Sequence, residues 1–349
     1  MGQGGVHADL PAGMALIWGA FGAMAGAFWS ASPSRVFVFA FFFALAEFVR
    51  GHLFGGFPWN LPGTTWVPGG ALSQAASLGG VYWLTLLTVF VMAAPAAMVD
   101  TRDARGLVLR IAPSFGAVIL LAFGWAWGAQ RIAAPSPLTE QYVVLMDSGV
   151  PQDEKWEVGP DAVMVEYLRM LTNGESEPGD IIVWPEGAVP TSLLNDINAL
   201  DAIGAYLGPR TLIAGTTRYQ LEGQNERVYF NSMVVLDENV SRSGAVALYD
   251  KFRLVPFGEL AAAQIIPFGQ SISDYLPGAM QQLARNGFQP GTGPAVIFAD
   301  NVPPFVALIC YEGLYPEITR AANLAARADW IVLVSNDAWF GGGMGPAQH

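Results

Sequence analysis

Charged residues are scarce in this chain, and the shortage is greatest in its first part. Lys, Arg, Asp and Glu make up 13% of the 349 residues, about half the share that a soluble protein carries. Residues 1–135 hold six basic and four acidic side chains, whereas residues 136–349 hold eleven and twenty-five. The second part therefore carries a net charge of −14 and the first part +2, within the total of −12. We expect a membrane-embedded segment followed by an acidic, water-exposed domain.

Cysteine and histidine are also rare, and each shortage excludes a class of site. The single cysteine, Cys310, excludes an internal disulfide. The three histidines (His7, His52 and His349) lie far apart without metal-ligand spacing, so we expect no metal and no other cofactor. The acidic balance leaves no basic patch for phosphates, which argues against nucleic acid as a partner.

Long apolar runs fill the first part of the chain. They cover residues 10–31, 36–49, 71–99 and 111–130. All but the second are free of charge and long enough to cross about 30 Å of hydrocarbon at 1.5 Å per residue. The alternative for any one run is a buried core helix, but four such runs in succession argue against that alternative. We therefore predict about four transmembrane helices within residues 1–132.

Arginines between these runs predict the orientation. Arg35 lies between the first two runs, and Arg102, Arg105 and Arg110 lie between the last two. The positive-inside rule places both loops in the cytoplasm, so the domain after residue 130 is expected on the periplasmic side. The N-terminus would then also start outside, which suggests that upstream helices are missing. Within the second run, Glu47 and Arg50 are three residues apart and share a helix face on which they can pair.

Short apolar strands alternate with helices after a proline-containing linker at residues 133–137. The expected strands are 141–147, 180–184, 211–217, 228–236, 245–249, 296–298, 305–310 and 330–334. The expected helices are 161–171, 193–207 and 318–328. Residues 258–290 are irregular and are expected to form an arm over the site. This alternation predicts a layered α/β domain at residues 133–349, with sheets buried on both faces.

Three of these strands end on side chains that are suited to covalent catalysis. Glu186 follows one in WPEGAVP, Lys251 follows another in YDKFRLVPFGE, and Cys310 closes a third in ICYE. A carboxylate, an ammonium and a thiol can serve as base, oxyanion donor and nucleophile. Each also has an ordinary interpretation: a helix-capping carboxylate, a solvated strand end and a small buried hydrophobe.

The set as a whole resembles the nitrilase (carbon–nitrogen hydrolase) superfamily. With the helices in front, GFPW after the second helix, PQDEKW early in the domain and SNDAWFG late, the chain looks like the apolipoprotein N-acyltransferase family in particular. The resemblance runs from about residue 10 to the last residue. It implies an αββα sandwich domain, here incomplete at its C-terminus. Because that family has more helices before the domain and one after it, we expect this chain to be an interior fragment.

The resemblance also implies residue roles. Glu186 would be the general base, Cys310 the nucleophile, and Lys251 with the backbone N–H of Tyr311 the oxyanion donors. Further residues match positions that the family needs for activity or for substrate binding; they are Glu259, Tyr311, Glu312 and Trp156. Asn231, Asn336 and Asp337 are additional polar candidates for the cleft, to which the sequence assigns no role.

The implied reaction moves an acyl chain from a glycerophospholipid to the α-amino group of a lipoprotein's diacylglyceryl-cysteine, through a Cys310 thioester. We expect a monomeric, multi-pass protein of the bacterial inner membrane. One alternative is a membrane-tethered amidase that uses the same triad on a small amide. Another is a non-enzymatic anchor that binds lipid or lipoprotein; replacement of a triad residue would indicate it, and all three are intact.

Overall fold

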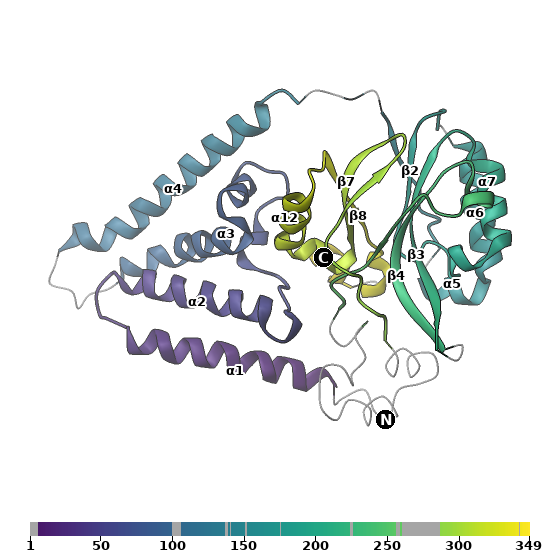
Figure 1. Ribbon diagram of the computed structural model, residues 1–349. Helices are drawn as coiled ribbons and strands as arrows, with labels where there is room; N and C mark the ends of the chain where they lie inside the picture. The colour runs from purple at the N-terminus through teal and green to yellow at the C-terminus, as the bar shows by residue number, and fades with distance from the viewer. Residues whose placement is uncertain are drawn as a thin grey trace. The chain divides into compact units, whose positions relative to one another are not determined.

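The computed structural model describes residues 6–99, 106–136, 139, 141–150, 152–174, 176–223, 226–255, 259, 287–341 and 343–349. The chain divides into two compact units, residues 1–137 and 138–349. Figure 1 shows helices in the first unit and two sheets with flanking helices in the second.

The described part of the first unit contains the four predicted helices. Their bounds are Val6–Ala27 (α1), Arg35–His52 (α2), Ala76–Ala93 (α3) and Leu107–Ala133 (α4). By length and composition, two stretches can cross a membrane: Leu72–Ala97, which contains α3, and Leu107–Ala133. Helix α2 is apolar but carries Arg35, Glu47 and Arg50.

The helix within the apolar run at residues 71–99 is shorter than the run itself. The segment starts with a 3-10 turn at Leu72–Ala75, continues as α3 and ends in a second 3-10 turn at Ala94–Ala97. Inside α3, Gly80 has a φ of 79°, which interrupts the helical backbone. Glycine adopts this left-handed conformation without a Cβ clash, so the Gly79-Gly80 pair bends an otherwise apolar helix.

The predicted pair of Glu47 and Arg50 forms and is buried. The same guanidinium donates to the backbone oxygens of Phe57 (2.5 Å) and Trp59 (2.8 Å). The pair therefore holds the segment that follows α2. Farther along this segment, the indole N–H of Trp66 donates to Thr88 of α3 at 2.8 Å.

Two sheets form the centre of the second unit. The first has the order β1-β2-β3-β4-β5, with strands Val143–Leu145, Ile181–Trp184, Thr211–Glu222, Glu226–Leu236 and Ala247–Asp250. Strands β1, β2 and β3 are parallel, whereas β4 is antiparallel to both of its neighbours. The second sheet has the order β6-β7-β8, with strands Val296–Ala299, Val302–Ile309 and Trp330–Val334.

Alternate side chains of these strands pack into different layers. Ile181 and Val183 face the second sheet and contact residues such as Ile309, whereas Ile182 and Trp184 face helices. The helices on that outer side are Pro160–Asn173 (α6) and Ile197–Leu207 (α7). Helix α12 (Pro316–Ala325) covers the other sheet. The layers are helix, sheet, sheet and helix, which confirms the predicted αββα sandwich.

Several predicted boundaries were wrong. The first strand is three residues long, the hairpin of β3 and β4 extends five residues beyond Thr217, and residues 193–207 divide into a 3-10 turn and α7. Helix α5 (Gln152–Val158) was not predicted. Most of the predicted arm, residues 258 and 260–286, lies outside the described residues.

Candidate active site

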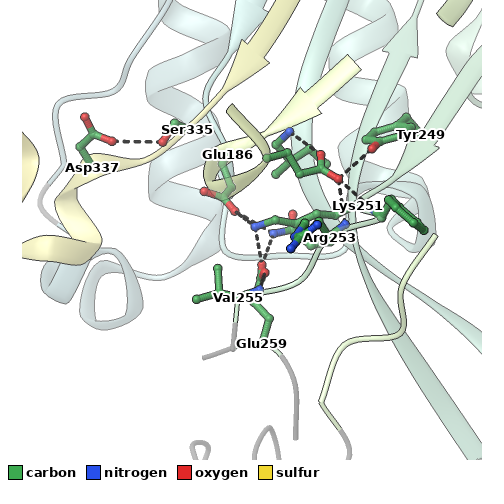
Figure 2. A network of polar contacts seen from close by, with 12 residues as sticks. Glu186, Tyr249, Lys251, Arg253, Val255, Glu259, Ser335 and Asp337 are labelled. Atoms are coloured by element: carbon green, nitrogen blue, oxygen red, sulfur yellow. Dashed lines mark hydrogen bonds and ion pairs between the residues drawn. The ribbon is translucent and has the colours of Figure 1, made fainter. Parts of the chain in front are cut away.

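The three predicted polar strand ends lie around one site. Figure 2 shows Glu186 beside Lys251, and the charges of both residues act on the Cys310 thiol. Glu186 follows β2, Lys251 follows β5, and Cys310 follows β7, so both sheets contribute. The turn at Glu186 packs closely against Gly215 of β3. A Cβ on Gly215 of β3 would lie 2.5 Å from the Cα of Glu186, so only glycine allows this approach.

Lys251 is the central cation and is 1% exposed. Its Nζ lies 2.8 Å from Oε1 of Glu259 and 3.6 Å from Oε1 of Glu186. Burial lowers the pKa of Lys251, but the Glu259 and Glu186 carboxylates outweigh burial and leave that pKa raised. The ammonium is therefore charged throughout the neutral range.

Asn231 of β4 joins the two carboxylates. Its Nδ2 donates to Oε1 of Glu186 at 2.7 Å and to Oε1 of Glu259 at 2.8 Å. Its backbone oxygen accepts from the Lys251 N–H at 2.8 Å. The amide thus fixes both acids around the lysine. The sequence suggested Asn231 for the cleft without a role, because this role appears only when β2, β3, β4 and β5 are assembled in one sheet.

Glu259 is held from both of its oxygens. Oε1 accepts from Lys251 and Asn231, and Oε2 accepts from the backbone N–H of Val255 at 2.8 Å. Its own backbone oxygen accepts from the N–H of Phe288 at 2.9 Å. A carboxylate bound in this way orients the lysine.

The two carboxylate oxygens of Glu186 differ in their hydrogen bonding. Oε2 is buried and has no hydrogen-bond partner among the described residues. The Glu186 charge nevertheless acts on the Cys310 thiol, whose pKa it raises. One oxygen is thus fixed by Asn231, and the other is left to accept a proton.

Cys310 does not belong to the strand that the sequence assigned to it. Strand β7 ends at Ile309, and Cys310 begins a 3-10 turn, Cys310–Leu314, with a φ of 50°. A non-glycine residue in this left-handed region is strained, and such strain is common at catalytic positions. The turn presents the thiol at the edge of the sheet.

The thiol is protonated at neutral pH. Burial, followed by the negative charge of Glu186, raises the pKa of Cys310 to about 12. The Lys251 ammonium and the Ser335 hydroxyl lower it, but by less. A thiol in this state is no preformed thiolate, and it would need a base to act as a nucleophile.

The Glu312 carboxylate accepts hydrogen bonds that hold the Cys310–Leu314 turn in place. It is fully buried, and its Oε1 accepts from the Tyr249 hydroxyl (2.8 Å) and from the backbone N–H groups of Phe252 (2.8 Å) and Arg253 (3.0 Å). Its Oε2 accepts from the Ile309 N–H at 2.9 Å. Burial raises the pKa of Glu312, while the hydrogen bonds from Arg253, Ile309 and Tyr249 lower it in part. This carboxylate ties the Cys310 turn to the Lys251 segment.

The remaining predicted residues lie in different places. The Tyr311 ring packs on Tyr315 in the cluster beneath α12, with centroids 5.2 Å apart. Trp156 lies in α5, but its side chain is outside the described residues. Asp337 accepts a 3.1 Å hydrogen bond from Ser335, and Asn336 caps the turn that follows β8. Ser335, which acts on the thiol, was missed because a serine after a strand carries no specific signal.

This arrangement supplies what acyl transfer through a cysteine requires. A neutral thiol, a carboxylate with one open oxygen and a fixed cation can form and stabilise a tetrahedral intermediate. Within the described parts of the chain, no group of three or more His, Cys, Asp or Glu side chains is placed to hold a metal ion.

Comparison with known proteins agrees with the architecture. A sequence model of the carbon-nitrogen hydrolase family matches residues 169–349, so the chain belongs to the carbon–nitrogen hydrolase family. The model of the apolipoprotein N-acyltransferase N-terminal domain matches residues 6–94. These matches confirm the resemblance that the motifs predicted.

Full-length relatives extend the comparison across both units. Apolipoprotein N-acyltransferases of Caulobacter vibrioides and Brucella melitensis biotype 1 are each 36% identical, over 97% of this chain and 63% of their own length. The chain thus spans somewhat less than two thirds of these relatives. Among solved structures, the NitN amidase from Neterenkonia sp. AN1 is 19% identical over 59% of this chain and 72% of that chain, with a TM-score of 0.34. The family assignment rests on the sequence matches.

Proposed function

We propose that the protein transfers an acyl chain from a glycerophospholipid to the α-amino group of a diacylglyceryl-modified cysteine at a lipoprotein N-terminus. The observation that carries the proposal is the arrangement of Glu186, Lys251 and Cys310 in a domain that follows an apolar helical unit in the chain. That unit matches the N-terminal domain model named for apolipoprotein N-acyltransferase. This match favours acyl transfer over hydrolysis of a small amide.

The first half-reaction acylates the enzyme. Oε2 of Glu186 takes the thiol proton as Sγ of Cys310 attacks the ester carbonyl. The oxyanion is stabilised by the Lys251 ammonium and the backbone N–H of Tyr311. When the ester bond breaks, Glu186 returns the proton to the departing lysophospholipid, and a thioester remains on Cys310.

The second half-reaction uses the same groups. The lipoprotein amine attacks the thioester carbonyl, Glu186 receives the amine proton, and the proton goes to the departing Cys310 sulfur. The products are an amide and the restored thiol. Glu259 and Asn231 hold Lys251 and Glu186, and Glu312 holds the turn, so these three are positioning residues in this scheme.

The helical unit supports a proposal for the location of the protein. We propose that residues 1–132 form a multi-pass membrane region and that residues 133–349 form a catalytic domain on the periplasmic side of the bacterial inner membrane. The two apolar stretches and the arginines between the last two runs support this orientation. Both substrates would then reach the site from the outer leaflet.

The test supplies both substrates to the membrane-embedded protein. Phosphatidylethanolamine with isotope-labelled acyl chains is the donor, and a synthetic diacylglyceryl-cysteine peptide with a free amine is the acceptor. We expect the peptide to gain the mass of one labelled acyl chain, and an N-acetylated copy to gain none. Release of the label only as free fatty acid, with the free-amine peptide present, would instead identify a hydrolase.

A further inference from the structure

The hairpin of β3 and β4 extends beyond the strands on either side of it (Figure 1). Strand β2 pairs with Thr211–Ala214 of β3, and β5 pairs with Ser232–Val235 of β4. Residues 217–222 and 226–231 therefore pair with each other and with no other strand of the described sheet. We call these residues the hairpin extension. Apart from Asn231, none of them has a role in the proposed reaction.

One face of the hairpin extension begins at the catalytic carboxylate. A Cβ on Gly215 would lie 2.5 Å from the Cα of Glu186, so this face of β3 lies against the general base. Side chains two positions apart share a face of a strand. The residues that follow on this face, given as cross-strand pairs from the carboxylate outward, are Thr217 with Asn231, Tyr219 with Tyr229, and Leu221 with Arg227. At about 3.4 Å per residue, this strip extends about 20 Å from Gly215 to Leu221.

Beyond Asn231 the strip is aromatic and apolar. The rings of Tyr219 and Tyr229 have centroids 6.1 Å apart, and the guanidinium carbon of Arg227 lies 4.6 Å from the Tyr219 ring centroid. Both tyrosines are partly exposed, and Leu221 is 60% exposed. Toward the tip, the opposite face carries polar side chains beside Val228; they are Gln220, Glu222 and Glu226. The hairpin extension is thus amphipathic, and its apolar face is the one that continues from the site.

Both edges of the hairpin extension are held at the tyrosine pair. The Asn195 side chain accepts from the Tyr219 N–H at 3.1 Å and donates to the Tyr219 oxygen at 3.4 Å. On the other edge, the Gln289 N–H donates to the Tyr229 oxygen at 2.8 Å, and the N–H of the preceding residue donates to the Glu259 oxygen at 2.9 Å. The tyrosine pair is therefore fixed relative to the acids of the site.

A hydrocarbon chain joined to the carbonyl that Cys310 attacks would fit this strip. Aromatic and aliphatic side chains bind such a chain because contact removes apolar surface from water. The strip is also continuous with the site, so a chain leaving the catalytic carboxylate meets it directly. We propose that Tyr219, Tyr229 and Leu221 form the binding surface for the acyl chain that is transferred. This inference rests on the proposed function and assigns an acyl-chain subsite within it.

The test compares two acyl donors that share a leaving group and differ in chain length. Octanoyl and palmitoyl p-nitrophenyl esters are supplied to the detergent-solubilised protein, and the rate of Cys310 acylation is measured for each. Tyr219→Asn and Leu221→Asn remove apolar surface from the strip, whereas Tyr219→Phe keeps the ring. Gln220→Asn changes a neighbouring residue on the opposite face and is the matched control. Dipalmitoyl phosphatidylethanolamine is supplied in parallel as the donor of the proposed function.

We expect the unsubstituted protein to react faster with the palmitoyl ester, and Tyr219→Asn and Leu221→Asn each to reduce this preference at least about fivefold, because the longer chain loses apolar contact. Tyr219→Phe and Gln220→Asn should keep the preference within about twofold. An equal loss with both esters, as a folding defect or impaired membrane contact of the tip would produce, would overturn the assignment, and so would no loss with either. Failure of the proposed function alone would leave the ester results unchanged, while phosphatidylethanolamine would give no Cys310 adduct.

Discussion

The side-chain amide of Asn231 lies 2.7 Å from Oε1 of Glu186 and leaves Oε2 of that carboxylate without a partner among the described residues. The hydrogen bond fixes Oε1, and Oε2 is available to accept a proton. A carboxylate held in this orientation does not have to reorient before it accepts a proton. Such fixed geometry is called preorganisation of an active site. The same amide nitrogen also binds Glu259, so one residue sets the positions of both acids.

Replacement of Asn231 should therefore impair chemistry more than folding. Asn231→Leu removes both hydrogen bonds at similar volume, and we expect acylation of Cys310 to slow by about 10- to 100-fold. Asn231→Asp should be worse, because a third carboxylate beside Glu186 and Glu259 repels both. The rate of thioester formation measures the effect. Equal activity of Asn231→Leu and the unsubstituted protein would contradict the positioning role.

The pH dependence of Cys310 alkylation follows from the direction of its pKa shift. Because the pKa is raised to about 12, the thiolate fraction at pH 8 is roughly a thousandfold below that of a free cysteine. We expect the rate of reaction with iodoacetamide to rise about tenfold per pH unit from pH 7 to pH 10, without a plateau. Mass spectrometry of the Cys310 peptide measures it. A plateau below pH 9 would show a preformed thiolate.

Removal of the Glu186 charge should change the alkylation rate of the Cys310 thiol and the rate of acylation in opposite directions. The charge raises the pKa of Cys310, so Glu186→Gln lowers that pKa and should speed iodoacetamide alkylation at pH 8. The same substitution removes the proton acceptor and should slow acylation by about 10²- to 10⁴-fold. Opposite changes in the two rates are expected. A parallel fall in both would indicate that the substitution disrupts the site.

Glu312 should matter for stability. Glu312→Ala leaves the Tyr249 hydroxyl and three backbone N–H groups without their acceptor, and we expect the free energy of unfolding to fall by at least about 3 kcal/mol. Glu317→Ala is the control, because Glu317 is 44% exposed and lies 3.7 Å from Arg253. Surface pairs of this kind contribute about 0–1 kcal/mol. Thermal unfolding followed by fluorescence compares the two; similar losses would contradict a supporting role for Glu312.

Sequence alone predicted the layers and the strand ends of the site well. Apolar runs of four to eight residues mark buried strands, and the polar residue after each is visible in the motifs of Glu186, Lys251 and Cys310. The contacts between them were not predictable, because Asn231 reaches Glu186 through the pairing of β4 with β3 and of β3 with β2, and meets Lys251 through the pairing of β4 with β5. Similarly, the positive φ of Cys310 occurs in a turn where Glu312 accepts from the Ile309 N–H, and the motif alone shows neither feature.

The most direct test of the account is the chemical state of Cys310 after exposure to donor alone. The membrane-embedded protein is incubated with acyl-labelled phosphatidylethanolamine and without an acceptor amine, and the Cys310 peptide is examined by mass spectrometry beside a Cys310→Ala control. We expect a mass increment of one acyl chain that hydroxylamine removes and that the control lacks. A peptide that carries no adduct and is still freely alkylated would contradict a phospholipid-derived thioester.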